Sequence, residues 1–74
     1  MQVDQLVRMA NQIGAFFEAM PDRAEAQENL AQHLRKFWDP RMRQAFLAHV
    51  DAVGTDGLRG ITAEAVQRHR RLIG

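Results

Sequence analysis

The sequence predicts an all-α fold, a small bundle of three longer helices and a short C-terminal helix. Alanine alone supplies 11 of the 74 residues, while β-branched residues are few and scattered, a composition that favours helix over strand. Apolar residues also recur at spacings of three and four, the pattern of an amphipathic helix. No linker or internal repeat divides the chain, so we expect one domain over residues 1–74.

The first helix is predicted from an N-cap at Asp4 to the residue before Pro21, since a proline disfavours the α conformation at its predecessor. Its apolar stripe comprises Leu6, Met9, Ile13, Phe16, Phe17 and Met20. The second helix should begin after Asp22, because Glu25 follows three residues later as in a capping box. Its stripe comprises Leu30, Ala31, Leu34, Phe37 and Trp38.

The third helix should begin at Pro40 with Asp39 as its N-cap, and Gly54 is placed to end it in the αL conformation. Its stripe comprises Met42, Ala45, Phe46, His49, Val50 and Val53. After a glycine-rich loop at residues 54–60, a short last helix is expected with Thr62 as its N-cap. Connections this short predict that successive helices are antiparallel neighbours.

Composition excludes several classes of protein. With no cysteine the chain cannot form disulfides, thiolate metal sites or a thiol nucleophile. A net charge of +1 is not typical of a nucleic-acid or anionic-membrane binder. The longest stretch without a charged or strongly polar residue is only residues 13–17, and residues 1–4 carry no basic or apolar leader segment. The expected location is the cytoplasm.

No catalytic, cofactor-binding or metal-binding residue is predicted. The three histidines, His33, His49 and His69, stand apart without the local spacing of a zinc motif, so packing roles are favoured over ligation. Glycines at 54, 57 and 60 have neither a preceding strand nor a following Gly-Lys-Ser/Thr, which argues against a phosphate loop. A chain of this length also leaves little room for an enclosed pocket.

The aromatic pairs Phe16-Phe17 and Phe37-Trp38 suggest a binding surface. Neighbours on a helix point about 100° apart, so each pair widens the apolar sector. Either the bundle covers both members, or one member faces another subunit as an interface anchor. We favour the second interpretation because small domains are only marginally able to bury their own apolar surface.

Two polar features leave alternatives open. Arg8, Asn11, Gln12 and Ala15 form a second stripe on the first helix, which is either solvated or a row of polar contacts to a partner. Residues 35–43 place four cations around two aromatics. This stretch is a solvated basic corner, a patch for acidic residues of another protein, or a nucleic-acid site.

Two blocks of sequence resemble the signature of a known family. Residues 6–13 read LVRMANQI and precede Phe16-Phe17, and residues 36–43 read KFWDPRMR. They are similar to the small delta subunit of the soluble, NAD-dependent, molybdenum-containing formate dehydrogenases of bacteria. The resemblance covers residues 4–50, including the spacing between the blocks, and fades beyond Val50, so the role of the region after residue 53 is left open.

The resemblance implies a non-catalytic accessory subunit that supports assembly or stability of the large molybdenum-containing subunit. The cofactors of such a complex are bis-molybdopterin guanine dinucleotide, iron–sulfur clusters, FMN and NAD, held by the other subunits. The residues expected to contact the partner are Arg8, Asn11, Gln12, Phe17, Trp38, Arg41 and Arg43. The alternative is an independent helical module that self-associates or binds nucleic acid through residues 35–43.

Overall fold

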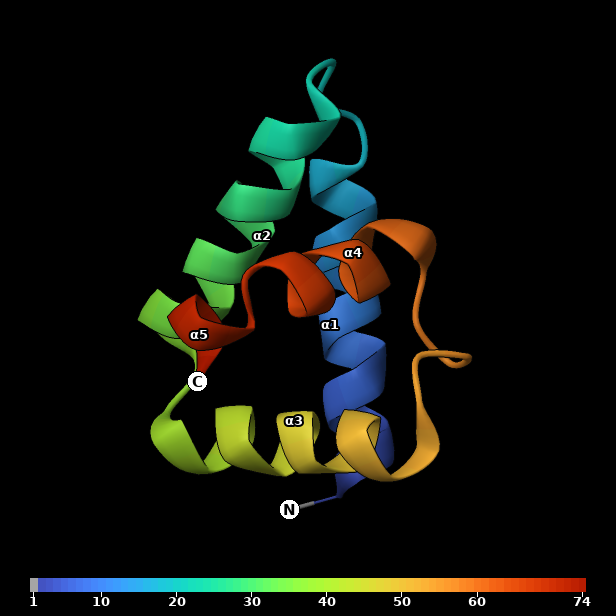
Figure 1. Ribbon diagram of the computed structural model, residues 1–74, viewed down its shortest axis with the longest axis vertical. Helices are drawn as coiled ribbons and strands as arrows, with labels where there is room; N and C mark the ends of the chain where they lie inside the picture. The colour runs from blue at the N-terminus through green and yellow to red at the C-terminus, as the bar shows by residue number, and fades with distance from the viewer. Residues whose placement is uncertain (1) are drawn as a thin grey trace.

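The computed structural model is built entirely of helices across residues 2–74, which confirms the all-α prediction (Figure 1). Met1, part of the segment where the sequence predicts no signal peptide, lies outside the described residues. The helices are α1 (Val3–Phe17), α2 (Arg23–Phe37), α3 (Pro40–Val53), α4 (Gly60–Arg68) and α5 (Arg70–Ile73).

Two helix starts follow the sequence closely. The Asp22 carboxylate accepts a hydrogen bond from the Glu25 N–H (3.0 Å), and the Asp39 carboxylate accepts one from the Met42 N–H (3.0 Å). Each cap satisfies one of the N–H groups that the first helical turn leaves unpaired. Gly54 ends α3 with φ of 84°, as expected for a glycine, but its ψ of −167° lies outside the αL region.

The other two predicted N-caps are wrong. Gln2 occupies the N-cap of α1 without a side-chain cap, and Asp4 lies in the first turn. The α1 helix also ends at Phe17, well before Pro21. The N-cap of α4 is Arg59, whereas Thr62 is fully buried inside that helix. The last helical segment is moreover interrupted at His69, so α4 and α5 are separate helices.

Figure 1 shows α1 and α2 side by side in opposite directions, with α3 lying across one end of the pair. The predicted antiparallel packing of successive helices is therefore wrong for α2 and α3. The cause is the two-residue connection, in which Trp38 and Asp39 both have extended backbone and turn the chain. Because the chain changes direction between α2 and α3, α3 packs on α1. The following helices, α4 and α5, then pack on α2.

The core has two adjoining parts. One is shared by all five helices and comprises Leu6, Ala10, Ala31, Leu34, Trp38, Phe46, Leu47, Val50, Val66 and Ile73. The other joins α2 to α4 and comprises Ala26, Leu30, Ile61 and Ala65. Within residues 2–74, no helix has both the length and the apolar character needed to cross a bilayer.

Helices α1 and α4 approach each other closely at Gly14. A Cβ added there would overlap Thr62 Oγ1 and lie 3.2 Å from Ile61 Cγ2. Only glycine leaves room for the two backbones to approach this closely. This contact explains why Thr62 is drawn into the interior instead of capping its helix.

Candidate functional site

Three of the seven residues predicted to contact a partner make specific contacts within the chain. The first is Asn11, whose Nδ2 donates to the Gly57 carbonyl (2.9 Å) while its Oδ1 accepts from the Arg59 N–H (2.9 Å). Both halves of the amide are thus occupied by the loop that precedes α4. The expected recognition of a backbone by this amide occurs, but with the chain's own loop.

The second is Trp38, which is only 5% exposed and packs edge-on against Phe46, with ring centroids 5.6 Å apart. Its neighbour Phe37 is 71% exposed. The exposed member of this pair is therefore Phe37, whereas the sequence predicted Trp38 as the partner contact. A spacing of four explains the outcome, because Leu30, Leu34 and Trp38 stand above one another on the buried side of α2.

The third is Arg43, which is 9% exposed. Its Nη1 donates to the Ile73 carbonyl (2.7 Å), so it satisfies one of the carbonyls left unpaired at the end of α5. With Trp38 also buried, the basic stretch at residues 35–43 does not form one exposed aromatic and cationic surface. Arg41, in contrast, is exposed on α3.

The remaining predicted residues lie at the surface of α1. Arg8 and Gln12 are exposed, and Phe17 is half-buried. Phe16, which was not among the predicted contact residues, is 75% exposed and is the more accessible member of the Phe16-Phe17 pair. The contact of these residues with a partner stays a prediction.

Four rings form a continuous row across α1 and α2, which we call the aromatic row: Phe16, Phe17, His33 and Phe37. Consecutive ring centroids are separated by 5.2 Å, 6.0 Å and 4.6 Å, with the first two pairs in edge-to-face arrangement. Such contacts hold the rings in place relative to one another. The row is an ordered apolar surface, exposed most strongly at its two ends.

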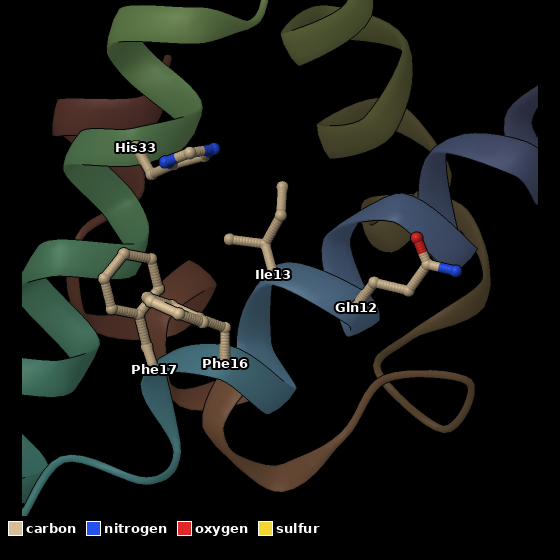
Figure 2. Close-up of a pocket in the computed structure, with 5 residues that line it drawn as sticks. All are labelled: Gln12, Ile13, Phe16, Phe17 and His33. Atoms are coloured by element: carbon tan, nitrogen blue, oxygen red, sulfur yellow. The ribbon is translucent and has the colours of Figure 1, made fainter.

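Two shallow hollows border the aromatic row. One of about 370 Å³, drawn in Figure 2, is almost entirely apolar, with Ile13, Phe16 and Phe17 from α1 opposite His33 from α2, and Gln12 at its rim. The other, of about 240 Å³, shares Phe17 and His33 and is completed by more polar residues of α2 and by Phe37. Together they make a groove between α1 and α2 that we call the aromatic groove.

His33 was assigned a packing role from the sequence, and it is found in the middle of the aromatic row. The signal that could have located the row is again a spacing of four, which places His33 and Phe37 on one side of α2. The prediction missed it because Phe37 was assigned to the core stripe.

Charged residues elsewhere form ion pairs that join the helices. Glu18 accepts from Arg59 Nη2 (2.6 Å) and lies 3.7 Å from Arg23 Nη1. Arg23 donates to Glu64, to which Gln27 Nε2 also donates (2.6 Å). Hydrogen bonding by Arg23 lowers the pKa of Glu64 to about 2, and hydrogen bonding by Arg59 lowers the pKa of Glu18. Both carboxylates are thereby held ionised as structural links.

Within residues 2–74, no group of three or more His, Asp or Glu side chains is arranged to hold a metal ion. Without cysteine, the chain also lacks the thiolates that hold iron–sulfur clusters. The arrangement best suited to function is the aromatic groove, because its apolar rings can bind another apolar surface.

The chain matches a known protein family over most of its length. A family described as NADH-dependent formate dehydrogenase delta subunit FdsD matches residues 5–66, which is most of the chain. The match extends beyond the blocks at residues 6–13 and 36–43 into α4. None of the curated proteins and none of the solved structures matches the chain.

Proposed function

The chain belongs to the FdsD family of NADH-dependent formate dehydrogenase delta subunits, and on that premise we propose that it is a non-catalytic accessory subunit. In this proposal residues 1–74 fold as one domain, in the cytoplasm. The domain binds the large molybdenum-containing catalytic subunit and supports its assembly or stability. Molybdenum cofactor, iron–sulfur clusters, FMN and NAD belong to the other subunits.

The aromatic groove carries this proposal. Phe16 and Phe37 are 75% and 71% exposed at the ends of a row of rings, whereas the aromatic residues Trp38 and Phe46 are buried. Burying one such side chain against a partner contributes about 1.5–3 kcal/mol. An apolar surface kept exposed in this way is typical of a protein–protein contact. The family supplies the partner, because a delta subunit implies other subunits.

The residues of the chain support a role without catalysis. The ionisable groups with shifted pKa values, such as Glu18 and Glu64, are engaged in ion pairs between helices and do not line the aromatic groove. An enzyme would need an acid, base or nucleophile beside its pocket. The groove is lined by phenyl rings, aliphatic groups and amides, and its two ionisable side chains, His33 and Lys36, have no carboxylate, hydroxyl or thiol beside them in the lining.

The test compares the formate dehydrogenase produced with and without this chain in the same host. We expect the chain to co-purify with the catalytic subunit. Its deletion should lower the yield of cofactor-loaded catalytic subunit and shorten the half-life of activity on warming. The turnover per molybdenum of whatever enzyme remains should be unchanged. Full loading and an unchanged half-life without the chain would contradict the proposal, as would formate oxidation by the isolated chain.

An independent module that binds nucleic acid through residues 35–43 is less well supported. Stacking on bases requires an accessible ring, whereas Trp38 is buried and Arg43 bonds to Ile73. A steep salt dependence of RNA or DNA binding would favour this alternative.

A further inference from the structure

The aromatic groove has the dimensions of a site for a helix. It lies between α1 and α2, two neighbouring helices of 15 residues each. The steps of 5.2 Å, 6.0 Å and 4.6 Å along the aromatic row limit its span to about 16 Å, or about three turns of α-helix. An amphipathic helix in such a groove would place apolar residues at spacings of three and four against the rings.

The charged residues around the groove further limit which kind of helix it can bind. Its lining contains Lys36 and His33 together with the amides of Gln12, Asn29 and Gln32, but no carboxylate. Arg8 is exposed one turn before Gln12 on α1. Among the ion pairs within residues 2–74, none uses Arg8 or Lys36. An apolar groove with Lys36 in its lining and Arg8 one turn before Gln12 is complementary to an apolar helix that carries acidic residues.

The cationic character is concentrated at one end of α2. Glu25 and Glu28 belong to its first turns, whereas Arg35 and Lys36 belong to its last turn, next to Phe37. The Phe37 end of the groove is therefore where acidic side chains of an occupant would be stabilised.

A second copy of the chain fits this surface poorly. In a symmetric dimer the same patch meets itself across the two-fold axis. Lys36 and Arg8 of one copy would then approach the same cations of the other, with no carboxylate in the groove lining to compensate. Like charges brought together in this way oppose association.

We infer that the aromatic groove receives an amphipathic helix of the larger formate dehydrogenase subunit, about three turns long. Its apolar face covers Phe16, Phe17, His33 and Phe37, and its acidic residues face Lys36 and Arg8. This inference rests on the proposed function and specifies its partner surface.

The first test uses cysteine as a label, which the chain permits because it has none of its own. Phe16→Cys and Phe37→Cys are labelled with a thiol reagent in the free chain and in the purified complex. Val53→Cys is the control, since Val53 is 61% exposed and lies on α3, outside the groove. We expect labelling at 16 and 37 to slow at least tenfold in the complex, with position 53 unchanged.

Equal reactivity of positions 16 and 37 in the free chain and in an intact complex would overturn the inference. If either groove variant fails to co-purify while Val53→Cys does, and its circular dichroism is unchanged, the groove is supported. If labelling of the isolated chain is slower at high than at low protein concentration, a second copy of the chain occupies the groove. That result would also overturn the inference.

The second test addresses charge. We expect Lys36→Glu to raise the Kd for the catalytic subunit about tenfold or more, and Lys36→Gln to raise it two- to threefold, in accord with the loss or reversal of a rim charge. Association of the wild-type chain should slow with added salt, and Lys36→Gln should reduce that dependence. Arg71→Glu, an exposed position on α5, is the matched control and should have no effect.

An unchanged or tighter Kd for Lys36→Glu would contradict an acidic occupant. Different results would contradict the proposed function and the assignment of the groove. If the wild-type chain does not bind the formate dehydrogenase at all, the proposed function is wrong. If it binds, but the groove variants bind equally well, only the assignment of the groove is wrong.

Discussion

Arg23 and Glu64 form a two-point contact that joins the start of α2 to α4. Arg23 Nε donates to Glu64 Oε1 (2.8 Å), and its Nη2 donates to Oε2 (3.0 Å). The planar guanidinium matches both oxygens of the carboxylate, and this geometry is more specific than a single ion pair. The residues are 41 positions apart in the chain, so the contact exists only once α4 has packed on α2.

This contact should make the protein sensitive to acid. The pKa of Glu64 is lowered from 4.5 to about 2, mainly by the hydrogen bond from Arg23. A carboxyl whose folded pKa is depressed stabilises the fold fully above its unfolded pKa, and that contribution is lost as the pH falls. The urea midpoint should therefore decline between pH 4.5 and about 2.

The variant Glu64→Gln tests this assignment, and Glu28→Gln is its matched control. Glu28 is exposed and makes no ion pair within residues 2–74. Glu64→Gln should flatten the decline of the midpoint in this pH range, while Glu28→Gln should follow the wild type. An unaltered decline in Glu64→Gln would assign the acid sensitivity to other groups.

Gly14→Ala should destabilise the protein, although alanine is the better helix former by about 1 kcal/mol. The new Cβ would overlap Thr62 Oγ1 and press on Ile61, so α1 and α4 would have to separate. Overpacking of this kind costs about 1–3 kcal/mol. The free energy of unfolding in urea measures it, and Gly57→Ala, which meets no atom within 4 Å, is the control.

The second substitution Thr62→Ala should restore part of the loss in Gly14→Ala, because it removes the overlapping oxygen. That oxygen is buried without a hydrogen-bond partner within residues 2–74, so its removal leaves no group unpaired. A strictly additive pair of substitutions would contradict the proposed overlap.

Asn11→Ala should release the loop at residues 54–60. It removes the bonds to the Gly57 carbonyl and the Arg59 N–H, each of which contributes about 1 kcal/mol. The amide hydrogen of Arg59 should exchange faster with solvent, as detected by NMR, and the urea midpoint should fall. Gln12→Ala, on the adjacent exposed position, should leave both observations unchanged.

Trp38→Ala and Phe37→Ala should separate folding from binding. Trp38 is 5% exposed against Phe46, so its truncation should cost about 3–5 kcal/mol of unfolding free energy. Phe37 is 71% exposed, and its truncation should change stability by less than about 0.5 kcal/mol while weakening the complex. Thermal melting and co-purification, measured on both variants, distinguish the two roles. The reverse result would place the tryptophan, not the phenylalanine, at the interface.

Local signals in the sequence predicted the helices well where one side chain determines the geometry. Asp22 and Asp39 cap their helices because each carboxylate has a free N–H three residues later. Thr62 could not be recognised as a core residue in the same way. Its position depends on the close approach of Gly14, a residue 48 positions earlier, and no local pattern reports such a contact.

The candidate site was predicted in outline only. The hypothesis that one member of an aromatic pair faces another subunit stays a prediction, while the structure buries Trp38, exposes Phe16 and Phe37 and half-buries Phe17. Which member is exposed depends on where other helices lie, because α3 supplies the Phe46 ring that covers Trp38. The crosswise placement of α3 follows from the extended backbone of Trp38 and Asp39, which apolar periodicity does not encode. The intrachain bonds of Asn11 were not foreseen for a related reason, since its bonding partners lie in a loop whose path is set by α4.

The burial of Trp38 has a practical consequence for spectroscopy. It is the only tryptophan, and the chain has no tyrosine, so intrinsic fluorescence originates from this one ring. That ring lies in the core beside Phe46 and does not line the aromatic groove. Its emission should shift when the helices come apart and stay constant when the groove is covered. A single native chromophore thus reports the integrity of the subunit independently of its occupancy.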